Sequence, residues 1–272
     1  MIIGIDIGST TTKAVSIYEG RVLHKIKTKA LDALTSATGA FGKMIVENGI
    51  KMSDIQKIMV TGAGAAKIKD DLFGISTGRA DEIQAIGIGG IFLAGRDDII
   101  IANVGTGTAI IDAGRKGIFH LGGSGVGGGT ILGLAKRLFA MSDFNGIMAL
   151  AEKGRLNQVD LFIEDITETD LSFFNRETTA SNFGKMLDSA RNEDIALALI
   201  NMVFQVIGML SVFAAKSKNT DRVIVTGNGS GNSIGKKVLQ AITGLYQIQF
   251  EYPPDAEYTT AIGAGLAWEQ NL

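Results

Sequence analysis

The sequence predicts an α/β fold with two lobes, each built on a mixed sheet flanked by helices. Three observations lead to this prediction. Apolar strands alternate with helical segments, a β-turn-β unit with a small polar turn occurs twice, about 97 residues apart, and the glycines cluster in turns. Strands that alternate with helices, introduced twice by a meander, favour a duplicated unit with a cleft between its halves.

Composition narrows the function classes before any motif is considered. The chain has 272 residues, of which 46 % are hydrophobic, so it can build a sizeable core and is not expected to be disordered. Lysine and arginine number 26 against 28 acidic residues, and the formal charge of −2 leaves no basic face for nucleic acid. We therefore expect any phosphate to be carried by a small ligand.

Cysteine usage and hydropathy exclude further classes. The sequence has no cysteine, which excludes disulfides, thiolate catalysis and cysteine-held zinc or iron–sulfur clusters. No basic leader precedes the apolar residues that begin at Ile2, and no uninterrupted apolar run is expected to reach the roughly 18 to 20 residues of a membrane span. The expected location is the cytoplasm, away from membranes.

The first half begins with a β-hairpin. Ile2–Ile7 has the pattern of a buried strand, a turn of glycine and hydroxyl residues follows, and Lys13–Tyr18 alternates well enough to return antiparallel. The other elements expected here are a strand at Arg21–Thr28, a helix at Leu31–Glu47, a strand at Lys57–Thr61 and a helix from about Arg79 to Leu93.

The second half restarts the pattern with a strand at Ile99–Asn103, a glycine-rich turn and a returning strand at Ala109–Ala113. The remaining expected strands are Gly117–Leu121, Arg222–Thr226 and Gln247–Phe250, and the remaining helices are Thr130–Ala140, Asp143–Lys153, Asn182–Ala190, Glu193–Lys216, Gly235–Thr243 and Thr259–Trp268. We place the boundary between the lobes near residue 97, which gives lobes of residues 1–97 and 98–272.

The turn of the first hairpin has the composition of a phosphate-binding tip. Glycine and small hydroxyl residues expose backbone N–H groups and let a polyphosphate approach the main chain, while a carboxylate at the strand end can hold Mg²⁺ through water. A lysine on the returning strand can supply a point charge to a phosphate oxygen. The candidate residues are Asp6, Gly8, Ser9, Thr10, Thr11 and Lys13.

The turn of the second hairpin has the same construction. Its residues are Gly105, Thr106, Gly107 and Thr108, preceded by Asn103 at the end of the strand. One such hairpin is common and has an ordinary structural reading, but a matched pair at this spacing favours nucleotide binding. Two tips, one per lobe, would hold the β- and γ-phosphates of a nucleotide from opposite sides.

Two further glycine-rich segments are candidates for the nucleotide site. Gly122–Thr130 leads directly into a helix, and backbone amides at a helix N-terminus favour an anion at Gly127, Gly128 and Gly129. Gly227, Asn228 and Gly229 follow a strand, where they suit the adenine and ribose side of the site or form a plain strand-to-helix turn.

Transfer of a phosphoryl group to a hydroxyl often needs a carboxylate that accepts the hydroxyl proton. Asp81 and Glu82 open a helix whose following residues carry almost no charge. Acids in the first turn of a helix are also favoured by the helix dipole, so the residues alone do not separate a catalytic role from a structural one. Asp112 and Asp143 are interpreted as solvated or capping acids, and His24 as an exposed strand residue.

One segment and one helix are interpreted structurally. Thr179–Gly184 has the pattern of a helix N-cap followed by an apolar anchor. The long helix near residues 193–216 has an apolar face that is typical of a core or a subunit interface.

Taken together, the motifs resemble the bacterial type II pantothenate kinases. The resemblance rests on Gly4-Ile5-Asp6-x-Gly8-x-Thr10-x-x-Lys13, Ala102-Asn103-Val104-Gly105-Thr106-Gly107-Thr108, Gly122-Gly123-x-Gly125-x-Gly127-Gly128-Gly129, Thr179-Ala180-x-Asn182-Phe183-Gly184 and Ala261-Ile262-Gly263-Ala264. Their order and spacing match over nearly the whole chain.

The resemblance implies a fold, an activity and site residues. It implies the two-lobe, actin-like (ribonuclease H-like) ATPase fold of the acetate and sugar kinase superfamily, a homodimer, Mg-ATP as phosphoryl donor, and the primary hydroxyl of pantothenate as acceptor in the first step of coenzyme A synthesis. Glu82 falls where that family has its catalytic base, so the resemblance favours Glu82 over Asp81. Thr106 matches a small hydroxyl residue that contacts the acceptor, and Asp6 is the expected metal-binding carboxylate.

One position departs from the family. The family has an arginine just before the third glycine-rich motif, where it helps to hold substrate or the transferred phosphate, and this sequence has His120. Histidine is neutral much of the time at pH 7 and offers no fixed cationic fork. Either another cation substitutes, or the acceptor is a different small hydroxyl compound.

Three alternative functions share parts of these motifs. A sugar or amino-sugar kinase shares the phosphate tips but usually needs an Asn-Asp pair at a strand end, which we do not find. An activator ATPase of 2-hydroxyacyl-CoA dehydratases has a similar start and acid-bearing helix, but it needs cysteines to hold its cluster. The third is a nucleotide-binding regulator without activity.

Overall fold

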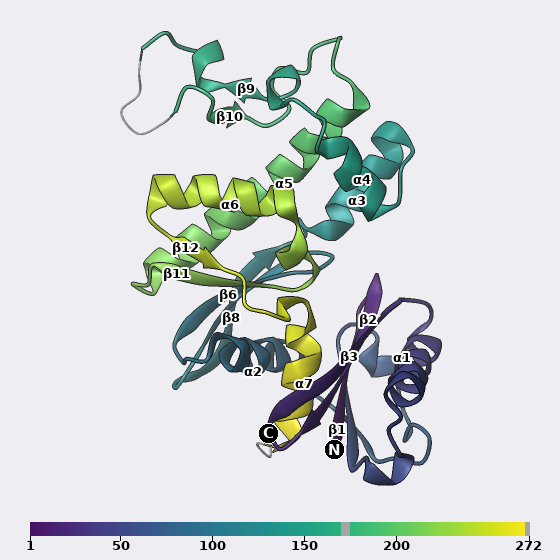
Figure 1. Cartoon of the computed structure of the whole chain (residues 1–272). Helices are drawn as coiled ribbons and strands as arrows, with labels where there is room; N and C mark the ends of the chain where they lie inside the picture. Colours follow the sequence, from purple (N-terminus) through teal and green to yellow (C-terminus); the bar gives the residue numbers. More distant parts are fainter. Residues whose placement is uncertain (170–174, 270–272) are drawn as a thin grey trace.

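The computed structural model describes residues 1–169 and 175–269 and consists of two lobes with one five-stranded mixed sheet each (Figure 1). Both sheets have the same topology. An antiparallel meander of three strands forms one side, and two further strands extend the first strand of the meander in parallel. This arrangement confirms the predicted duplicated α/β fold.

The N-terminal sheet has the strand order β3-β2-β1-β4-β5, and the C-terminal sheet has the equivalent order β8-β7-β6-β11-β12. The N-terminal strands are β1 Ile2–Ile7, β2 Thr11–Tyr18, β3 Arg21–Lys29, β4 Lys57–Thr61 and β5 Thr77–Arg79. The C-terminal strands are β6 Ile99–Val104, β7 Thr108–Gly114, β8 Gly117–Ser124, β11 Arg222–Thr226 and β12 Gln249–Glu251.

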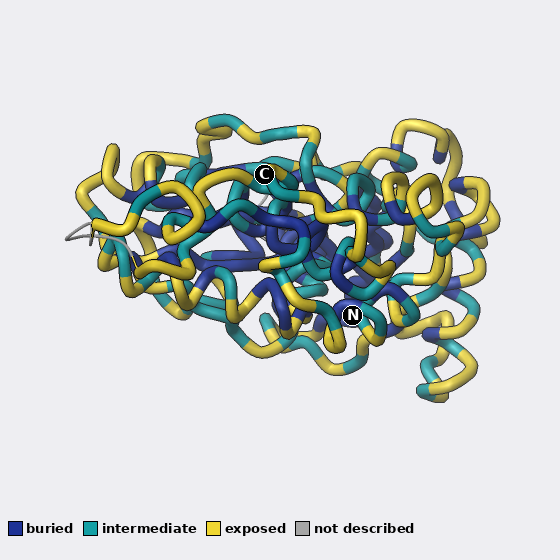
Figure 2. Tube along the Cα trace, turned by 90° about the horizontal axis from the view of Figure 1, so that it is seen from above, coloured by how far each residue is buried: buried dark blue, intermediate teal, exposed yellow. Residues whose placement is uncertain are grey.

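The helices cover the sheets in layers. They are α1 Ala33–Asn48, α2 Glu82–Ala94, α3 Gly128–Phe139, α4 Phe144–Ala151, α5 Asn192–Ser217, α6 Ser233–Tyr246 and α7 Thr259–Glu269. Helix α1 packs on the outer face of the N-terminal sheet, and α5 packs on that of the C-terminal sheet. Buried positions gather along the middle of the molecule, and exposed positions lie mainly in the loops (Figure 2).

Short elements complete the chain. One-turn 3₁₀ helices lie at Met52–Asp54, Ala65–Lys67, Leu156–Gln158, Ile163–Asp165, Asn228–Gly231 and Ala256–Tyr258. Strands β9 (Leu161–Phe162) and β10 (Thr179–Ser181) form a small antiparallel ribbon next to α5 (Figure 1).

Helices α2 and α7 form the layer between the two sheets. Helix α2, which comes from the first half of the sequence, packs on β6, β7 and β8 of the C-terminal sheet. Helix α7, at the end of the chain, packs on β1, β2 and β4 of the N-terminal sheet. The two helices also pack against each other, so each half of the sequence contributes the inner cover of the other half's sheet. A lobe boundary near residue 97 stays a prediction.

Glycines allow the backbones in this layer to approach each other closely. A Cβ atom at Gly263 of α7 would overlap the carbonyl oxygen of Ala85 in α2, and one at Gly89 of α2 would overlap that of Thr259. Gly4 in β1 is held in the same way against the backbone of α7. Backbone-to-backbone contact at these positions leaves no room for any side chain.

One predicted helix starts too early, and another does not form. Helix α2 begins at Glu82 rather than near Arg79, because residues 77–79 form β5 and Asp81 is the N-cap, with its Oδ1 accepting from the amide of Gln84 at 3.0 Å. The helix expected at Asn182–Ala190 does not form, and residues 182–190 are turns and bends.

A buried carboxylate explains the missing helix. Asp160 is fully buried, and its Oδ1 accepts from the amide of Phe183 at 3.0 Å. The amides of Lys185 and Met186 both donate to the carbonyl of Val159, and Phe183 has a left-handed φ of 60°. Because these donors are used by the neighbouring segment, they cannot form an i to i−4 ladder. The predicted N-cap role of Thr179–Gly184 is wrong for the same reason.

The longest helix is strongly apolar, although polar residues such as Asn201 and Gln205 interrupt its apolar run. Within the described residues, α5 alone has the length and composition of a membrane span. However, 61 % of its most apolar window is buried inside the protein, against the C-terminal sheet and α6. A core helix of a globular lobe has this property as well.

The α2–α7 contact leads to the first prediction. Gly263→Ala places a methyl group on the Ala85 carbonyl, so we expect it to lower the free energy of unfolding by about 1–3 kcal/mol, as overpacking does. Gly39→Ala in α1 is the matched control, because Gly39 is helical and has open space around its Cα. It should instead raise stability by about 0.5–1 kcal/mol. Urea unfolding of both variants measures the difference, and equal effects would contradict the tight crossing.

Candidate active site

The first hairpin tip carries a buried ion pair at its base. Asp6 and Lys13 are cross-strand partners in β1 and β2, 9 % and 4 % exposed, and Lys13 Nζ lies 4.0 Å from Asp6 Oδ2. Burial raises the pKa of Asp6 to about 6, although Lys13 opposes this shift, and Glu82 raises it further. Burial likewise lowers the pKa of Lys13, against the opposing effect of Asp6. Both the carboxylate of Asp6 and the ammonium of Lys13 therefore lose the stabilisation that water gives to a charged group.

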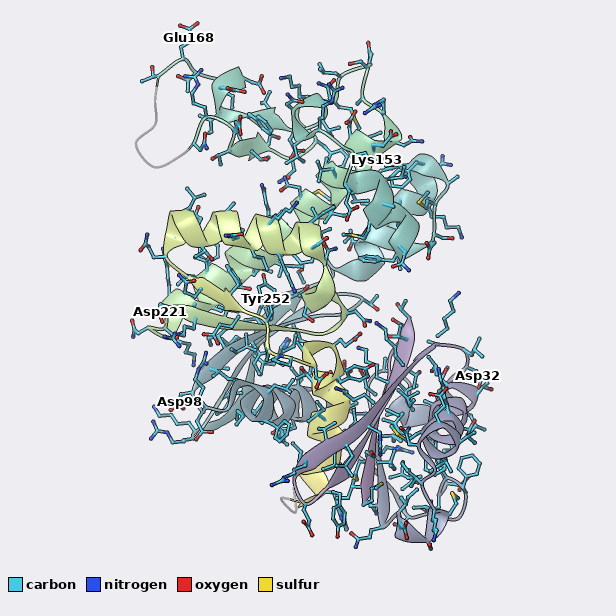
Figure 3. All side chains as sticks on the ribbon, in the orientation of Figure 1. Asp32, Asp98, Lys153, Glu168, Asp221 and Tyr252 are labelled. Atoms are coloured by element: carbon cyan, nitrogen blue, oxygen red, sulfur yellow. The ribbon has the colours of Figure 1, made fainter. Side chains whose placement is uncertain are left out.

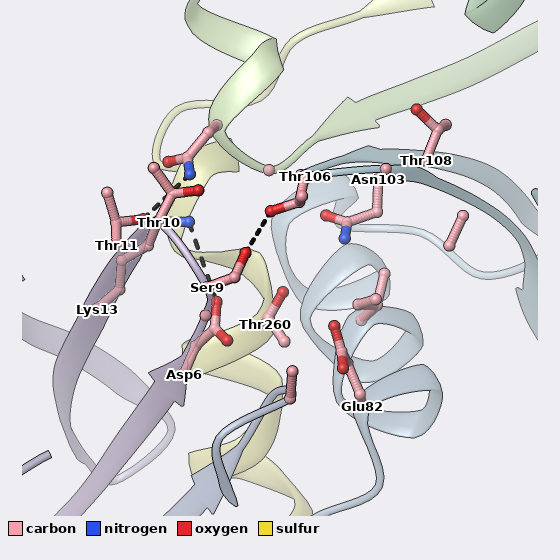
Figure 4. A pocket seen from close by; sticks show the side chains of 18 of the residues that line it. Asp6, Ser9, Thr10, Thr11, Lys13, Glu82, Asn103, Thr106, Thr108 and Thr260 are labelled. Atoms are coloured by element: carbon pink, nitrogen blue, oxygen red, sulfur yellow. Dashed lines mark hydrogen bonds and ion pairs between the residues drawn. The ribbon is translucent and has the colours of Figure 1, made fainter. Parts of the chain in front are cut away.

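The second hairpin tip meets the first directly. Ser9 Oγ and Thr106 Oγ1 are 2.5 Å apart, one from each tip, as Figure 4 shows. The two tips thus form the roof of a cavity of about 340 Å³ between the lobes. Most of the predicted site residues line it: Asp6, Gly8, Ser9, Thr10, Thr11, Lys13, Glu82, Gly105, Thr106, Gly107, Thr108, Gly227 and Asn228.

The third glycine-rich segment packs closely against the second hairpin tip. The amides of Gly128 and Gly129 donate to the carbonyls of Gly105 and Thr106, both at 2.9 Å. These two N–H groups are therefore already paired within the protein, and contact of Gly127, Gly128 and Gly129 with a nucleotide stays a prediction. A Cβ at Gly127 would come within 2.7 Å of the Thr106 carbonyl oxygen. The segment is therefore a close support for the second tip.

The fourth segment connects the lobes. Gly227 has a φ of 77° at the end of β11, and a Cβ there would come within 2.6 Å of the Val104 carbonyl oxygen. The next residue, Asn228, donates from Nδ2 to Thr11 Oγ1 at 3.1 Å. The left-handed glycine turns the chain so that an amide from the C-terminal lobe reaches the first tip.

The structure separates the two adjacent acids. The carboxylate of Asp81 is used as the N-cap of α2. Glu82 instead lies on the cavity wall, across from Asp6 (Figure 4). Its pKa is raised, first by desolvation and then by the charge of Asp81. A carboxylate with a raised pKa in a cleft has the properties of a general base.

Two larger cavities continue from the first. One, of about 700 Å³, shares Ser9, Thr106 and Asn228 with it and is also lined by Gly128, Gly129 and Gly229. The other, of about 500 Å³, lies between α4 and α6 and again includes Asn228. Because all three cavities are lined by Asn228, they adjoin one another.

Ion pairs close one side of this cleft. Lys25 and Lys27 in β3 extend to the C-terminal lobe, where their Nζ atoms lie 2.7 Å from Asp255 and 2.6 Å from Glu257. All four side chains are more than one-third exposed, so each pair contributes only about 0–1 kcal/mol. Lys27 also lines both larger cavities.

Several polar residues lie away from the cleft. His120 is exposed on β8 and is not among the residues that line the three cavities, so the structure does not place it with the other predicted site residues. Asp112 pairs with Lys218 at 2.5 Å, and Asp143 caps α4 through the amide of Gly146, which confirms its capping role. His24 lies in β3 but is partly buried rather than exposed.

The sequence reasoning missed residues on the inner wall. Asn103, Ser124 and Thr260 line the first cavity. Asn103 is held by Thr226, whose Oγ1 lies 3.0 Å from Asn103 Oδ1. The position of Asn103 at the end of a strand, before a glycine turn, could have identified it as a site residue. No local pattern identifies Thr260, because only the packing of the last helix brings it to the cavity.

The side chains near the hairpin tips suit a metal ion that takes most of its ligands from water and substrate rather than from the protein. Among residues 1–169 and 175–269, no group of three or more His, Cys, Asp or Glu side chains has the geometry of a metal site. Asp6 and Glu82 are the two acidic side chains that line the first cavity, and Asp6 lies at the base of the first hairpin tip. Mg²⁺ commonly binds through one or two carboxylates, waters and substrate phosphates, so the residues present fit that ion.

Comparison with known proteins agrees with this geometry. Residues 98–246 match the family model described as Fumble. A type II pantothenate kinase of Bacillus cereus is 31 % identical over 277 residues, which cover 97 % of this chain and 96 % of the relative. One from Staphylococcus aureus is 29 % identical and covers 97 % of this chain and 98 % of its own length.

Solved structures share the fold. The activator of the 2-hydroxyisocaproyl-CoA dehydratase from Clostridium difficile, with bound ADPNP, superposes with a TM-score of 0.69 at 18 % identity and covers 99 % of this chain and 96 % of its own. A ROK family glucokinase from Streptomyces griseus, in complex with glucose and AMPPNP, has a TM-score of 0.59 at 14 % identity, with 99 % of both chains covered.

Proposed function

The chain belongs to the type II pantothenate kinase family, and from that premise we propose how its cleft transfers a phosphoryl group from ATP to pantothenate. The product is 4′-phosphopantothenate, in the first step of coenzyme A biosynthesis. The family rests on relatives that match at about 30 % identity over 97 % of the chain and on the Fumble match. The observation that carries the proposed mechanism is the meeting of the two hairpin tips above Asp6 and Glu82.

The tips bind the polyphosphate of ATP. Glycine and hydroxyl residues at both turns allow phosphate oxygens to approach the backbone, and the contact between Ser9 and Thr106 brings the tips together. Lys13 supplies positive charge from below the first tip. Positioning and charge neutralisation account for most of the catalysis in phosphoryl transfer, and these residues provide both.

Asp6 is the metal-binding residue of the proposal. A bound Mg²⁺ would supply positive charge that neutralises the charge developing on the phosphates. Asp6 would hold it from the end of β1, where its carboxylate lines the cavity and Lys13 limits how far its pKa rises. A cation at this position would also replace Lys13 as the main partner of the carboxylate.

Glu82 is the proposed general base, and Thr106 the residue that contacts the acceptor. The Glu82 carboxylate faces the tips across the cavity and accepts the proton of the attacking hydroxyl. A raised pKa makes it a stronger base than an ordinary glutamate. The proposal further includes a homodimer and a cytoplasmic location, which the family resemblance implies.

The departure at His120 makes a direct test of the acceptor necessary. It replaces the arginine of the family and is exposed on β8, outside the cleft lining. Purified protein with Mg-ATP should convert pantothenate to 4′-phosphopantothenate, detected by mass spectrometry, and should leave a parallel panel of hexoses and N-acetylhexosamines largely unreacted. Preferred transfer to a sugar would overturn the assignment of the acceptor, and ATP binding without any transfer would overturn that of the reaction.

A pair of neighbouring variants tests the base. Glu82→Gln removes the proton acceptor and should lower kcat by about 10²- to 10⁴-fold while binding of ADP is retained. Asp81→Asn should leave turnover within a few-fold of wild type, because asparagine caps a helix about as well as aspartate. Steady-state kinetics and ADP titration of both proteins measure the contrast. A large loss in Asp81→Asn with an active Glu82→Gln would reverse the assignment.

The raised pKa of Asp6 predicts a pH dependence of metal-nucleotide binding. Since a protonated carboxyl does not hold Mg²⁺, the affinity for Mg-ADP should fall as the pH decreases through about 6, the pKa of the free protein. Calorimetric titrations between pH 5.5 and 8 measure it, and titrations without Mg²⁺ correct for protonation of ADP itself. Asp6→Asn should bind Mg-ADP weakly and without this pH dependence. Matching profiles in both proteins would exclude Asp6 as the metal-binding residue.

A further inference from the structure

The cavity beneath the tips is lined by an amide that the proposed reaction does not use. Asn103 lies in β6, three residues before Thr106, and shares the lining of this cavity with Asp6 and Glu82. Figure 4 shows its amide group pointing into the cavity, on the side of Glu82. The side chain is half-buried, so the amide is open to a molecule that enters between the base and the second tip.

The fold holds one end of this amide. Thr226 in β11 is fully buried, and its hydroxyl donates to Asn103 Oδ1 at 3.0 Å. The contact follows from the sheet register, because Thr226 and Asn103 are partners in the parallel pair of β11 and β6. Nδ2 then faces the cavity, and no hydrogen bond within the described residues uses it. The opposite orientation of the amide would turn Oδ1 toward the carboxylate of Glu82, so that two acceptors would face each other.

Neighbouring donors in the cavity are already paired. The hydroxyls of Ser9 and Thr106 contact each other at 2.5 Å, and that of Thr108 donates to a backbone carbonyl at 2.9 Å. The Nδ2 of Asn228 donates to a hydroxyl of the first tip. Asn103 therefore offers a ligand two N–H groups that these neighbours do not.

Packing fixes Asn103 relative to the proposed base. Glu82 opens α2, which packs on β6, and Ile86 of this helix shares its core with β6 and β7. Ile83, Ile86 and Ala109 add an apolar wall to the same cavity. The base, the amide and the apolar wall thus belong to one packed unit, whereas the buried ion pair of the first tip belongs to the other sheet.

This combination suits an alcohol that has a second oxygen nearby and apolar carbons between the two oxygens. Pantothenate has this form, because its primary and secondary hydroxyls lie on either side of a carbon that carries two methyl groups. With the primary hydroxyl at Glu82, the methyl groups can pack on Ile83 and Ile86, and the secondary hydroxyl can accept from Nδ2 of Asn103. A hexose has hydroxyls on neighbouring carbons but no apolar substituent for this wall.

We propose that Asn103 is a specificity-determining residue for the acceptor, and that its Nδ2 donates to the secondary hydroxyl of pantothenate. The inference rests on the proposed function, because it takes pantothenate as the acceptor and Glu82 as the base. Thr226 is then a positioning residue, since its hydroxyl fixes which end of the amide faces the acceptor. A site that hydrogen-bonds a substrate hydroxyl discriminates strongly against an analogue without it, because the protein group is then left unpaired.

A cycle of two acceptors and two proteins tests the contact. The acceptors are pantothenate and its analogue without the secondary hydroxyl, and the proteins are the wild type and Asn103→Ala. In the wild type we expect kcat/KM for the analogue to be about 10-fold or more below that for pantothenate. In Asn103→Ala, kcat/KM for pantothenate should fall by about 10-fold or more, and the two acceptors should then agree within about 3-fold. The KM for ATP and the affinity for ADP should stay within about 3-fold of wild type.

A second substitution and a control guard against indirect effects. Asn103→Leu excludes the water molecule that could replace the amide in Asn103→Ala, and it should show the same loss of preference between the acceptors. Asn157→Ala is the control, because Asn157 is exposed in the 3₁₀ helix Leu156–Gln158 and lines none of the three cavities. Figure 3 places Lys153, just before this helix, in the outer part of the C-terminal lobe. The control should keep the wild-type preference.

The remaining outcomes separate this inference from the proposed function. Equal preference between the acceptors in the wild type and in Asn103→Ala would overturn the role of Asn103, even though pantothenate is phosphorylated. A kcat that falls equally with both acceptors, together with a shifted pH profile of kcat, would mean that the amide acts through Glu82 and would overturn its role in specificity. Weaker binding of ADP as the main effect would assign the amide to the nucleotide and overturn that role as well. Absence of transfer to pantothenate by the wild type would overturn the proposed function, and this inference with it.

Discussion

The contact between α2 and α7 sets the geometry on which the rest of the molecule depends. Because Gly263 and Gly89 let the two helix backbones touch, only one layer of two crossed helices separates the sheets. The carboxyl end of β1 and that of β6 then lie close enough for a single pair of hydroxyls, Ser9 and Thr106, to join the tips. A wider layer would leave the tips apart and the cavity beneath them open.

The cleft contains several charged and polar groups that are buried away from water. The carboxylate of Asp6 and the ammonium of Lys13 are both removed from water, and neither fully compensates the other at 4.0 Å. Amide and hydroxyl atoms of Asn228, Asn232 and Tyr252 are buried without partners in the described residues. Such groups reduce the stability of the free protein, and a bound ligand that pairs with them recovers that free energy.

Local patterns predicted the parts of this structure that depend on local rules. Period-two strands, hairpin turns of small residues and the repeat of the unit indicated both sheets and both tips, and most of the predicted cleft residues line one cavity. Contacts between distant segments were not predictable in this way. The amides of Gly128 and Gly129 are consumed by a turn that precedes them by more than 20 residues, and the segment at Asn182–Ala190 is held by the buried Asp160.

The exchanged positions of α2 and α7 bear on how such a chain can be rearranged by recombination. A crossover near residue 97 would separate α2 from the C-terminal sheet that it covers and α7 from the N-terminal sheet. Each resulting half would carry one helix with its apolar face exposed and one sheet with an inner face uncovered. The two repeated units look like separate modules in the sequence, but neither can be exchanged alone. A recombinant that keeps the fold has to carry residues 82–94 and 259–269 together. Because the glycines at their contact leave no room for side chains, the two helices fit each other only when both come from the same parent.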